Sequence, residues 1–444
     1  MIILELLNLP GLKTLSTEDL GGRYTVRVEG TVHQNTVCCR QQMYRHGSQK
    51  QAYMDTPMRG KRVLIEIDRR RFRCNLCGKT QFELLPSMDG KRQATRRLIK
   101  YIEERCLKET FVSLAREVGV DDKTIRFIFD DYVARRQTEV AFSMPEVMGI
   151  DELKIVGEYR AMLTNIDKLA LFDMVHSRKK ASLLEYFDSL PNKHEVKVLV
   201  MDMWQVYRQV GEKVFPGRLI VTDKFHVVRM AHDGLDRVRK RLRRSLDDRT
   251  RLKLKDDRWI LLKRSGKLTT DELKVRNQWF DQFPALAYAY TAKERFFDIY
   301  THPSRAAAEQ AAREWVDSLD PLIAHDFLAL QVALRNWWTE IFNYYEKPVS
   351  NDYTESVNNV TRFINRMGRG YSFEVLRARL LYDDNAVKNA SAFIRKKVRR
   401  DQTPDGVCHM PRPGTFNNDY EETVTQYGAH LPTLARLLED GYFS

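Results

Sequence analysis

Three acidic residues, Asp151, Asp202 and Glu355, have the side-chain type and the sequence context needed to bind divalent metal ions. Asp151 ends a strand-like run over residues 147–151, and Asp202 directly follows a buried-strand pattern over residues 196–201. If these two strands are neighbours in one sheet, both carboxylates emerge at the same edge. Carboxylates at close range repel one another unless cations lie between them, and Mg²⁺ prefers carboxylate, water and phosphate oxygens. The trio therefore predicts a site for two Mg²⁺ or Mn²⁺ ions, which suits in-line phosphoryl displacement.

Glu355 is expected on a helix over residues 353–366, which opens after a polar turn that contains Pro348. At helical spacing, one predicted face of this helix carries polar side chains: Asn351, Glu355, Asn358, Asn359 and Arg362. A single acid at a strand end is usually a cap or a surface group. The ordered trio, inside a βββαβαβ pattern, is much more specific.

Four of the six cysteines lie in two close pairs near the N-terminus. Cys74 and Cys77 form a C-x-x-C turn, which can place two thiolates on one zinc ion. The other pair, Cys38 and Cys39, is adjacent, and adjacent side chains rarely both face one ion. We expect Cys38 to be the third ligand, with the fourth left open among Cys39, His33 and His46. The alternative is that Cys38 and Cys39 are core residues and no metal binds.

A helix-turn-helix pattern follows near residue 114. Ala115 allows close helix packing, Gly119 makes the turn, and Ile125 packs back on the pair, while Asp121 or Asp122 can cap the second helix. Side chains suited to bases and phosphates lie on this second helix and on the basic helix before the motif: Lys123, Thr124, Arg126, Arg96, Arg97 and Lys100. A generic helical hairpin is the plainer interpretation, and the basic helix favours DNA binding over it.

The elements that must position these residues fall into distinct segments. The predicted fold class is multidomain: an α/β catalytic domain with an all-α insertion, preceded by a small β zinc-ribbon and a helical helix-turn-helix domain. The predicted boundaries are 1–90 for the zinc-ribbon-like domain, 91–140 for the helix-turn-helix domain, 141–231 and 346–395 for the catalytic domain, 232–345 for the helical insertion and 396–444 for a basic, loop-rich tail.

The composition is consistent with a nucleic-acid partner. The 444 residues include 74 Lys and Arg against 60 Asp and Glu, a formal charge of +14. Such a basic balance favours a polyanion, although many basic proteins bind no nucleic acid. There is no apolar run of about 18 residues, so no membrane span is expected. The short apolar N-terminus lacks a basic flank and is not expected to be a signal peptide, which predicts the cytoplasm, with association to the nucleoid when the protein is bound to DNA.

The combined motifs resemble one family of proteins over nearly the whole chain. The segments that carry this resemblance are residues 69–74 with Cys77, 149–152, 200–203 with Tyr207, 222–226, 261–263 and 355–359. On these, the chain resembles the transposases of bacterial insertion sequences known as the IS-L-three group. The resemblance implies that the α/β catalytic domain is RNase H-like and is interrupted by the all-α insertion. The first cysteine pair departs from the family pattern, because Asn35 stands where a cysteine is expected.

The resemblance implies a function and roles for individual residues. It implies a transposase that binds terminal inverted repeats, cuts DNA and joins ends to target DNA, with Asp151, Asp202 and Glu355 as the metal-binding triad. Glu152, Asp223 and His226 match family positions near that site. Asp223 is the alternative member of the triad if Asp202 is not a metal ligand. Bringing two DNA ends together predicts a homodimer in the DNA complex.

Two other functions are compatible with the same residues. A non-catalytic DNA-binding regulator descended from a transposase would keep the fold, although the presence of all three acids argues against such decay. An RNase H-like nuclease would cut DNA without joining it, and only product analysis separates it from a transposase.

Overall fold

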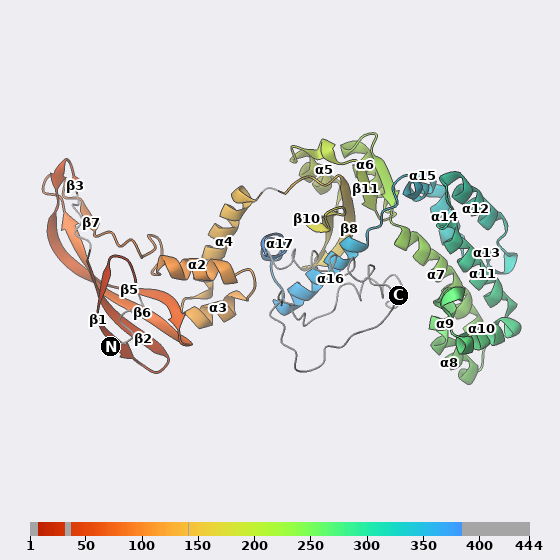
Figure 1. Ribbon diagram of the computed structural model, residues 1–444, viewed down its shortest axis with the longest axis horizontal. Coiled ribbons are helices and arrows are strands. Elements are labelled where there is room, and N and C mark those ends of the chain that lie inside the picture. Colours follow the sequence, from red (N-terminus) through yellow and green to blue (C-terminus); the bar gives the residue numbers. More distant parts are fainter. Residues whose placement is uncertain (1–7, 32–36, 141, 384–444) are drawn as a thin grey trace, which may run out of the picture. The chain divides into compact units, whose positions relative to one another are not determined.

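The computed structural model describes residues 8–31, 37–140 and 142–383 (Figure 1). The chain divides into two compact units, Met1–Ala141 and Phe142–Ser444. The predicted C-terminal tail and His33 lie outside the described residues. Among the described residues, none of the helices is both long enough and apolar enough to cross a membrane.

The first unit is built on a mixed sheet with the strand order β1-β2-β6-β5, to which β7 adds beside β6. Its strands are β1 (Leu12–Asp19), β2 (Arg23–Gly30), β5 (Tyr44–Met58), β6 (Lys61–Arg73) and β7 (Thr80–Phe82). The turn between the long strands β5 and β6 uses left-handed backbone at Arg59 and Gly60, with φ of 53° and 74°. A small ribbon of β3 (Val37–Cys38) and β4 (Gln41–Gln42) carries the first cysteine pair.

Three helices complete this unit: α2 (Arg96–Arg105), α3 (Phe111–Val118) and α4 (Asp122–Glu139). Both α2 and α3 contact β5. The fully buried Asp55 of β5 accepts hydrogen bonds from Thr95 Oγ1, at 2.6 Å, and from Arg97 Nε, at 2.7 Å. Because a buried carboxylate is stable only when it is paired, these bonds tie the start of α2 to the sheet. The boundary predicted near residue 90 therefore falls inside one compact unit and stays a prediction.

The second unit contains a five-stranded sheet with the order β10-β9-β8-β11-β12. Its strands are β8 (Val147–Ile155), β9 (Glu158–Asn165), β10 (Ala170–Val175), β11 (Val198–Met201) and β12 (Leu219–Thr222). The first three pair antiparallel, and β11 pairs in parallel with both β8 and β12. This is the predicted RNase H-like sheet. One detail of the prediction was wrong: β8 continues past Asp151, because β9 pairs with it as far as Ile155.

Four helices pack with this sheet: α5 (Lys180–Asp188), α6 (Gln205–Val214), α16 (Asp352–Met367) and α17 (Phe373–Tyr382). Helix α16 contacts β8 and β9, whereas α17 contacts β10. The contact of α16 with β8 and β9 brings residues near 355 to the strand that carries Asp151.

The predicted all-α insertion is present between β12 and α16 (Figure 1). Its α-helices are α7 (Lys224–Arg243), α8 (Asp248–Asp256), α9 (Arg258–Leu262), α10 (Thr270–Gln282), α11 (Pro284–Ile299), α12 (Arg305–Asp317), α13 (Pro321–Ala324), α14 (Leu328–Asn336) and α15 (Trp338–Phe342). Helix α7 starts directly after β12, before the predicted boundary at residue 232, and runs without a break into the helical region. Buried side chains of the sheet and of these helices form one continuous core.

Candidate active site

The pairing of β8 with β11 brings Asp151 and Asp202 together. Met201 at the end of β11 is paired with Ile150, so the next residue on each strand is one of the two aspartates. Asp151 is buried, and its carboxylate accepts hydrogen bonds from the Glu152 backbone N–H at 2.7 Å and from Asn358 Nδ2 at 2.6 Å. The second of these bonds links the sheet to α16, the helix that carries Glu355.

Glu355 lies in the first turn of α16, whose position is fixed by buried polar contacts. Asn351 Nδ2 donates to the carbonyl of Ile150 at 3.1 Å, and the Thr354 hydroxyl lies 2.6 Å from the Thr164 hydroxyl. The close approach requires Gly149, because a Cβ there would lie 2.5 Å from Asn351 Oδ1. The helix therefore packs on β8 in a position that a larger side chain at residue 149 would prevent.

Two acids of the site, Asp151 and Glu355, resist ionisation. Burial, followed by repulsion from the Asp202 charge, raises the pKa of Asp151 to about 8. Burial, followed by repulsion from Asp223, raises the pKa of Glu355 to about 7. Gathered carboxylates of this kind are relieved by a divalent cation, whose charge favours the ionised form.

Two oxygens at the site are suited to a metal ion or to water. Asp202 Oδ1 and Asn358 Oδ1 are buried and accept no hydrogen bond from any residue that the structure describes. His226 Nδ1 lies 3.0 Å from Asp202 Oδ1 but makes its hydrogen bond to Asp223 Oδ2. Buried oxygens that accept no hydrogen bond are uncommon, so these carboxylate and amide oxygens fit a hard cation.

Asp223 plays a different part from Asp202. It is fully buried, and it accepts hydrogen bonds from the backbone N–H of Phe225 and of Asn351 as well as from His226. Burial works against protonation of His226, but its close contacts with the Asp202 and Asp223 carboxylates outweigh burial and raise the pKa of His226 to about 11. The His226 side chain is therefore a cation between two carboxylates. Both carboxylate oxygens of Asp223 already accept hydrogen bonds. Asp202 is therefore the better candidate metal ligand.

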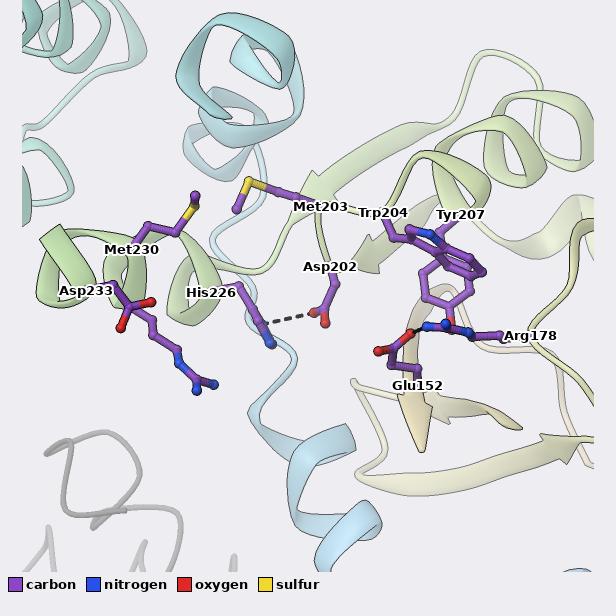
Figure 2. A pocket seen from close by; sticks show the side chains of 10 residues that line it. Glu152, Arg178, Asp202, Met203, Trp204, Tyr207, His226, Met230 and Asp233 are labelled. Atoms are coloured by element: carbon purple, nitrogen blue, oxygen red, sulfur yellow. Dashed lines mark ion pairs between the residues drawn. The ribbon is translucent and has the colours of Figure 1, made fainter. Parts of the chain in front are cut away.

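A cleft of about 410 Å³ opens beside Asp202 and His226 (Figure 2). On one side Arg178 packs over the Trp204 ring at 4.6 Å and forms an ion pair with Glu152. The Tyr207 hydroxyl is buried there without a hydrogen-bond partner among the described residues. Burial and the charges of Asp151 and Asp202 hold the pKa of Tyr207 well above its usual range, so the hydroxyl keeps its proton.

The structure separates the predicted polar face of α16 into two groups. Asn351 and Asn358 bond to the acids and to β8, whereas Asn359 accepts a hydrogen bond from the exposed Arg362 at 3.0 Å. Some residues of the site were missed by sequence reasoning, namely Arg178, Trp204, Thr164 and Thr354. Arg178 and Thr164 reach the site from other segments of the chain, whereas Trp204 and Thr354 are sequence neighbours of Asp202 and Glu355 whose residue types alone do not signal a role.

The structure also brings four cysteine thiols together. Cys38, Cys39, Cys74 and Cys77 each offer a sulfur, and these sulfurs lie within 4.8 Å of one another. The adjacent pair can face one point because Cys39 and Arg40 both take left-handed backbone, with φ of 50° and 61°. His46 is not part of the group. A hydrogen bond from the Lys79 backbone, then bonds with the other thiols, lowers the pKa of Cys77 to about 7, which favours the thiolate that zinc binds.

The helix-turn-helix has the predicted register. Ala115 and Ile125 are buried between α3 and α4, Gly119 has φ of 81°, and the Asp121 side chain caps α4 by accepting from the Thr124 backbone N–H. The predicted contact residues Lys123 and Arg126 are exposed on α4, and Arg96 and Lys100 are exposed on α2. Thr124 is half-buried, and Arg97 is engaged with Asp55.

Comparison with known proteins identifies the class and then the family. A family model described as a transposase matches residues 148–380, more than half of the chain. A model for the helix-turn-helix domain of transposase family ISL3 matches residues 83–133, and a model for the zinc-finger of the transposases of IS204, IS1001, IS1096 and IS1165 matches residues 37–77. The transposase for insertion sequence element IS1001 of Bordetella parapertussis is 22% identical over 342 residues, which cover 75% of this chain and 84% of that protein. The chain therefore belongs to the ISL3 family of transposases, and the predicted resemblance is confirmed.

Proposed function

We propose that this transposase binds the terminal inverted repeats of an insertion sequence, cuts DNA and joins the cut ends to target DNA by a two-metal mechanism. The observation that carries the proposal is the register of β8 and β11, which sets Asp202 beside Asp151, together with α16, which is bonded to the same strand and bears Glu355.

Asp151, Asp202 and Glu355 would hold two Mg²⁺ or Mn²⁺ ions. Such ions activate the attacking oxygen and stabilise the leaving oxygen of a phosphodiester. The protein contributes position: Asn358 orients Asp151, Asn351 holds the start of α16, and protonated His226 balances the charge of Asp202 and Asp223. Glu152 is engaged by Arg178 at the rim and has an auxiliary role.

The first unit would supply DNA binding. One structural Zn²⁺ on Cys38, Cys39, Cys74 and Cys77 would fix the ends of the long hairpin, and α4 would present Lys123, Thr124 and Arg126 to DNA. Arg96 and Lys100 are exposed for phosphate contacts. Because transposition must bring two DNA ends together, we expect a homodimer in the DNA complex.

The test is a strand-transfer assay with terminal-repeat DNA and Mg²⁺ or Mn²⁺. Wild type should produce cut and joined strands, and Asp151→Ala should bind the DNA without producing either. Equal joining by both proteins would overturn the catalytic assignment. Cutting without joining would favour an RNase H-like nuclease, and DNA binding without cutting by wild type would favour a regulator.

A further inference from the structure

One face of α7 connects the candidate active site to a second cleft in the helical region. Residues spaced alternately three and four apart share a face of an α-helix, and this face of α7 carries His226, Arg229, Asp233, Asp236, Lys240 and Arg243. The first three line the cleft beside Asp202, and the last three line a cleft of about 580 Å³ between α7, α8 and α9. A single helix therefore holds the two clefts at a fixed spacing.

The second cleft is strongly basic. Its floor is the buried carboxylate of Asp236, which pairs with Arg239 at 2.7 Å and with Arg258 at 3.2 Å. The lining holds five basic side chains against two acidic ones: Arg239, Lys240, Arg243, Lys255 and Arg258 against Asp236 and Asp256. Because Asp236 neutralises part of the floor, the surplus positive charge lies at the rim.

The rim combines exposed cationic groups with an aromatic surface. The Lys240 side chain is 62% exposed although it pairs with Asp236, and Lys255 is exposed on α8. Trp259, on α9, is 44% exposed. Lysine and arginine beside an exposed indole are typical of surfaces that contact a nucleic-acid backbone.

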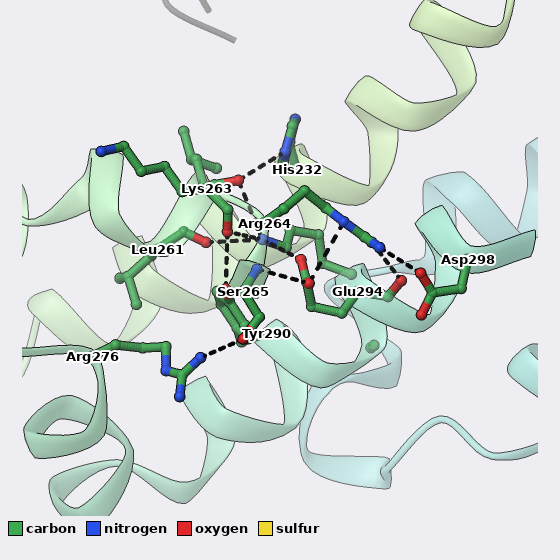
Figure 3. Close-up of polar contacts among 12 residues, drawn as sticks. His232, Leu261, Lys263, Arg264, Ser265, Arg276, Tyr290, Glu294 and Asp298 are labelled. Atoms are coloured by element: carbon green, nitrogen blue, oxygen red, sulfur yellow. Dashed lines mark hydrogen bonds and ion pairs between the residues drawn. The ribbon is translucent and has the colours of Figure 1, made fainter. Parts of the chain in front are cut away.

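Helix α9, which carries Trp259, is held in place by contacts with buried residues. The side chain of Lys293 is fully buried, and its ammonium donates hydrogen bonds to the carbonyls of Leu261, Leu262 and Lys263, where α9 ends. It also pairs with Glu294 at 2.9 Å, and the surrounding network includes an ion pair between Arg264 and Asp298 (Figure 3). A cation at the carboxyl end of a helix interacts favourably with the negative end of the helix dipole, so buried Lys293 stabilises the position of α9.

We propose that this basic cleft binds the phosphate backbone of the DNA duplex whose scissile phosphate lies at the three acids. The inference rests on the proposed function, since it takes the acids as the point of cleavage. His226 and Lys240 are separated by about 21 Å along α7, at about 1.5 Å per residue. For a duplex that runs along α7, at about 3.4 Å per base pair, the contacted phosphates lie about six base pairs from the cut.

The salt dependence of DNA binding tests the surface without requiring catalysis. The full-length chain is titrated with a labelled 30-base-pair duplex of arbitrary sequence over a series of salt concentrations. Lys255→Gln should reduce the slope of log K against log salt by about one, because one phosphate contact is lost. Lys255→Arg should keep the wild-type slope. Lys274→Gln, at another exposed lysine, on α10, is the matched control and should also keep it.

A photo-reactive amino acid at position 259 tests the spacing. With terminal-repeat DNA it should crosslink about six base pairs from the strand break that wild type makes. Two results would overturn the inference while cleavage itself persists. The first is an unchanged slope for Lys255→Gln. The second is a crosslink within two base pairs of the break, or no crosslink at all. If the wild-type protein makes no strand break, the proposed function fails. A reduced slope for Lys255→Gln would then still show that DNA binds at this cleft.

Discussion

At the scale of single residues, the site depends on side chains that hold the acids as much as on the acids themselves. Asp151 is buried among groups that repel its charge, and Asn358 is the side chain that donates to it from α16. An amide donor favours the ionised carboxylate and fixes the orientation of its oxygens. Asn358 is therefore expected to act as a positioning residue.

We predict that Asn358→Ala lowers the rate of metal-dependent cleavage by about 10–100-fold, the usual effect of removing a partner of a metal ligand. DNA affinity should not change, because the contact lies inside the site. The measurement is cleavage rate as a function of Mg²⁺ concentration. The neighbouring variant Asn359→Ala removes the acceptor of a hydrogen bond from Arg362 and should behave as wild type. A wild-type rate for Asn358→Ala would refute the role of this amide.

At the scale of secondary-structure elements, the packing of α16 on β8 decides where Glu355 lies. A Cβ at position 149 would approach Asn351 Oδ1 at 2.5 Å, Thr164 Oγ1 at 2.5 Å and Thr354 Oγ1 at 2.6 Å. All three atoms belong to buried polar side chains that are already hydrogen-bonded to one another or to β8, so they cannot move aside freely.

Gly149→Ala is therefore predicted to destabilise the second unit by about 1–3 kcal/mol and to reduce metal-dependent cleavage through the shift of α16. Chemical denaturation and cleavage assays measure the two effects. Gly266→Ala adds the same methyl group at a position with no atom within 4 Å and should be neutral. If Gly149→Ala keeps both stability and activity, the packing argument fails.

The cysteine cluster is a second feature at the scale of secondary-structure elements, because it joins the β3–β4 ribbon to the turn after β6. We predict one zinc ion per chain, and that Cys39→Ser lowers zinc affinity by more than the roughly 10–100-fold loss expected for an outer-shell change. Zinc titration against a chelator gives the affinity. Cys106→Ala, at the end of α2 and away from the cluster, should keep the full metal content. Unchanged affinity in Cys39→Ser would exclude Cys39 as a ligand.

Local patterns were sufficient to predict much of this architecture. The alternating and apolar runs predicted the strands of the RNase H-like sheet, and the spacing of Ala115, Gly119 and Ile125 predicted the helix pair. Contacts between distant segments were not predictable. The engagement of Arg97 by Asp55 depends on how a helix meets a sheet, and the Arg178–Trp204 wall depends on strand pairing. The fourth thiol was left open because left-handed backbone at Cys39 and Arg40 is not visible in their residue types.

At the scale of the whole molecule, the helical region shares one core with the five-stranded sheet of the second unit, and buried titratable groups lie within the helical region. His232 on α7 bonds through Nε2 to the Leu262 carbonyl at 3.2 Å. Burial, then repulsion from the nearby Lys293 cation, lowers the pKa of His232 to about 4. Between this value and the ordinary pKa of about 6.5, the unfolded chain binds a proton that the folded chain does not.

This group should therefore reduce the free energy of unfolding as the pH falls from about 6.5 to about 4, by at most about 3 kcal/mol. Above pH 6.5 its contribution is constant. Denaturation of wild type and His232→Gln across this range isolates the effect, because other titrating groups are common to both proteins. If the free energies of unfolding of the two proteins differ by the same amount at all pH values, the depressed pKa of His232 is contradicted.

The central claim is that Asp151, Asp202 and Glu355, far apart in the chain, converge on one metal site. Iron-directed hydroxyl-radical cleavage of the full-length chain tests this without DNA, because Fe²⁺ bound at a magnesium site cuts the polypeptide nearby. With Fe²⁺ and ascorbate, we predict fragments that end near residues 151, 202 and 355, all suppressed together by excess Mg²⁺. Cuts near 151 and 202 that never include the region of 355, or cuts that Mg²⁺ does not suppress, would contradict the account.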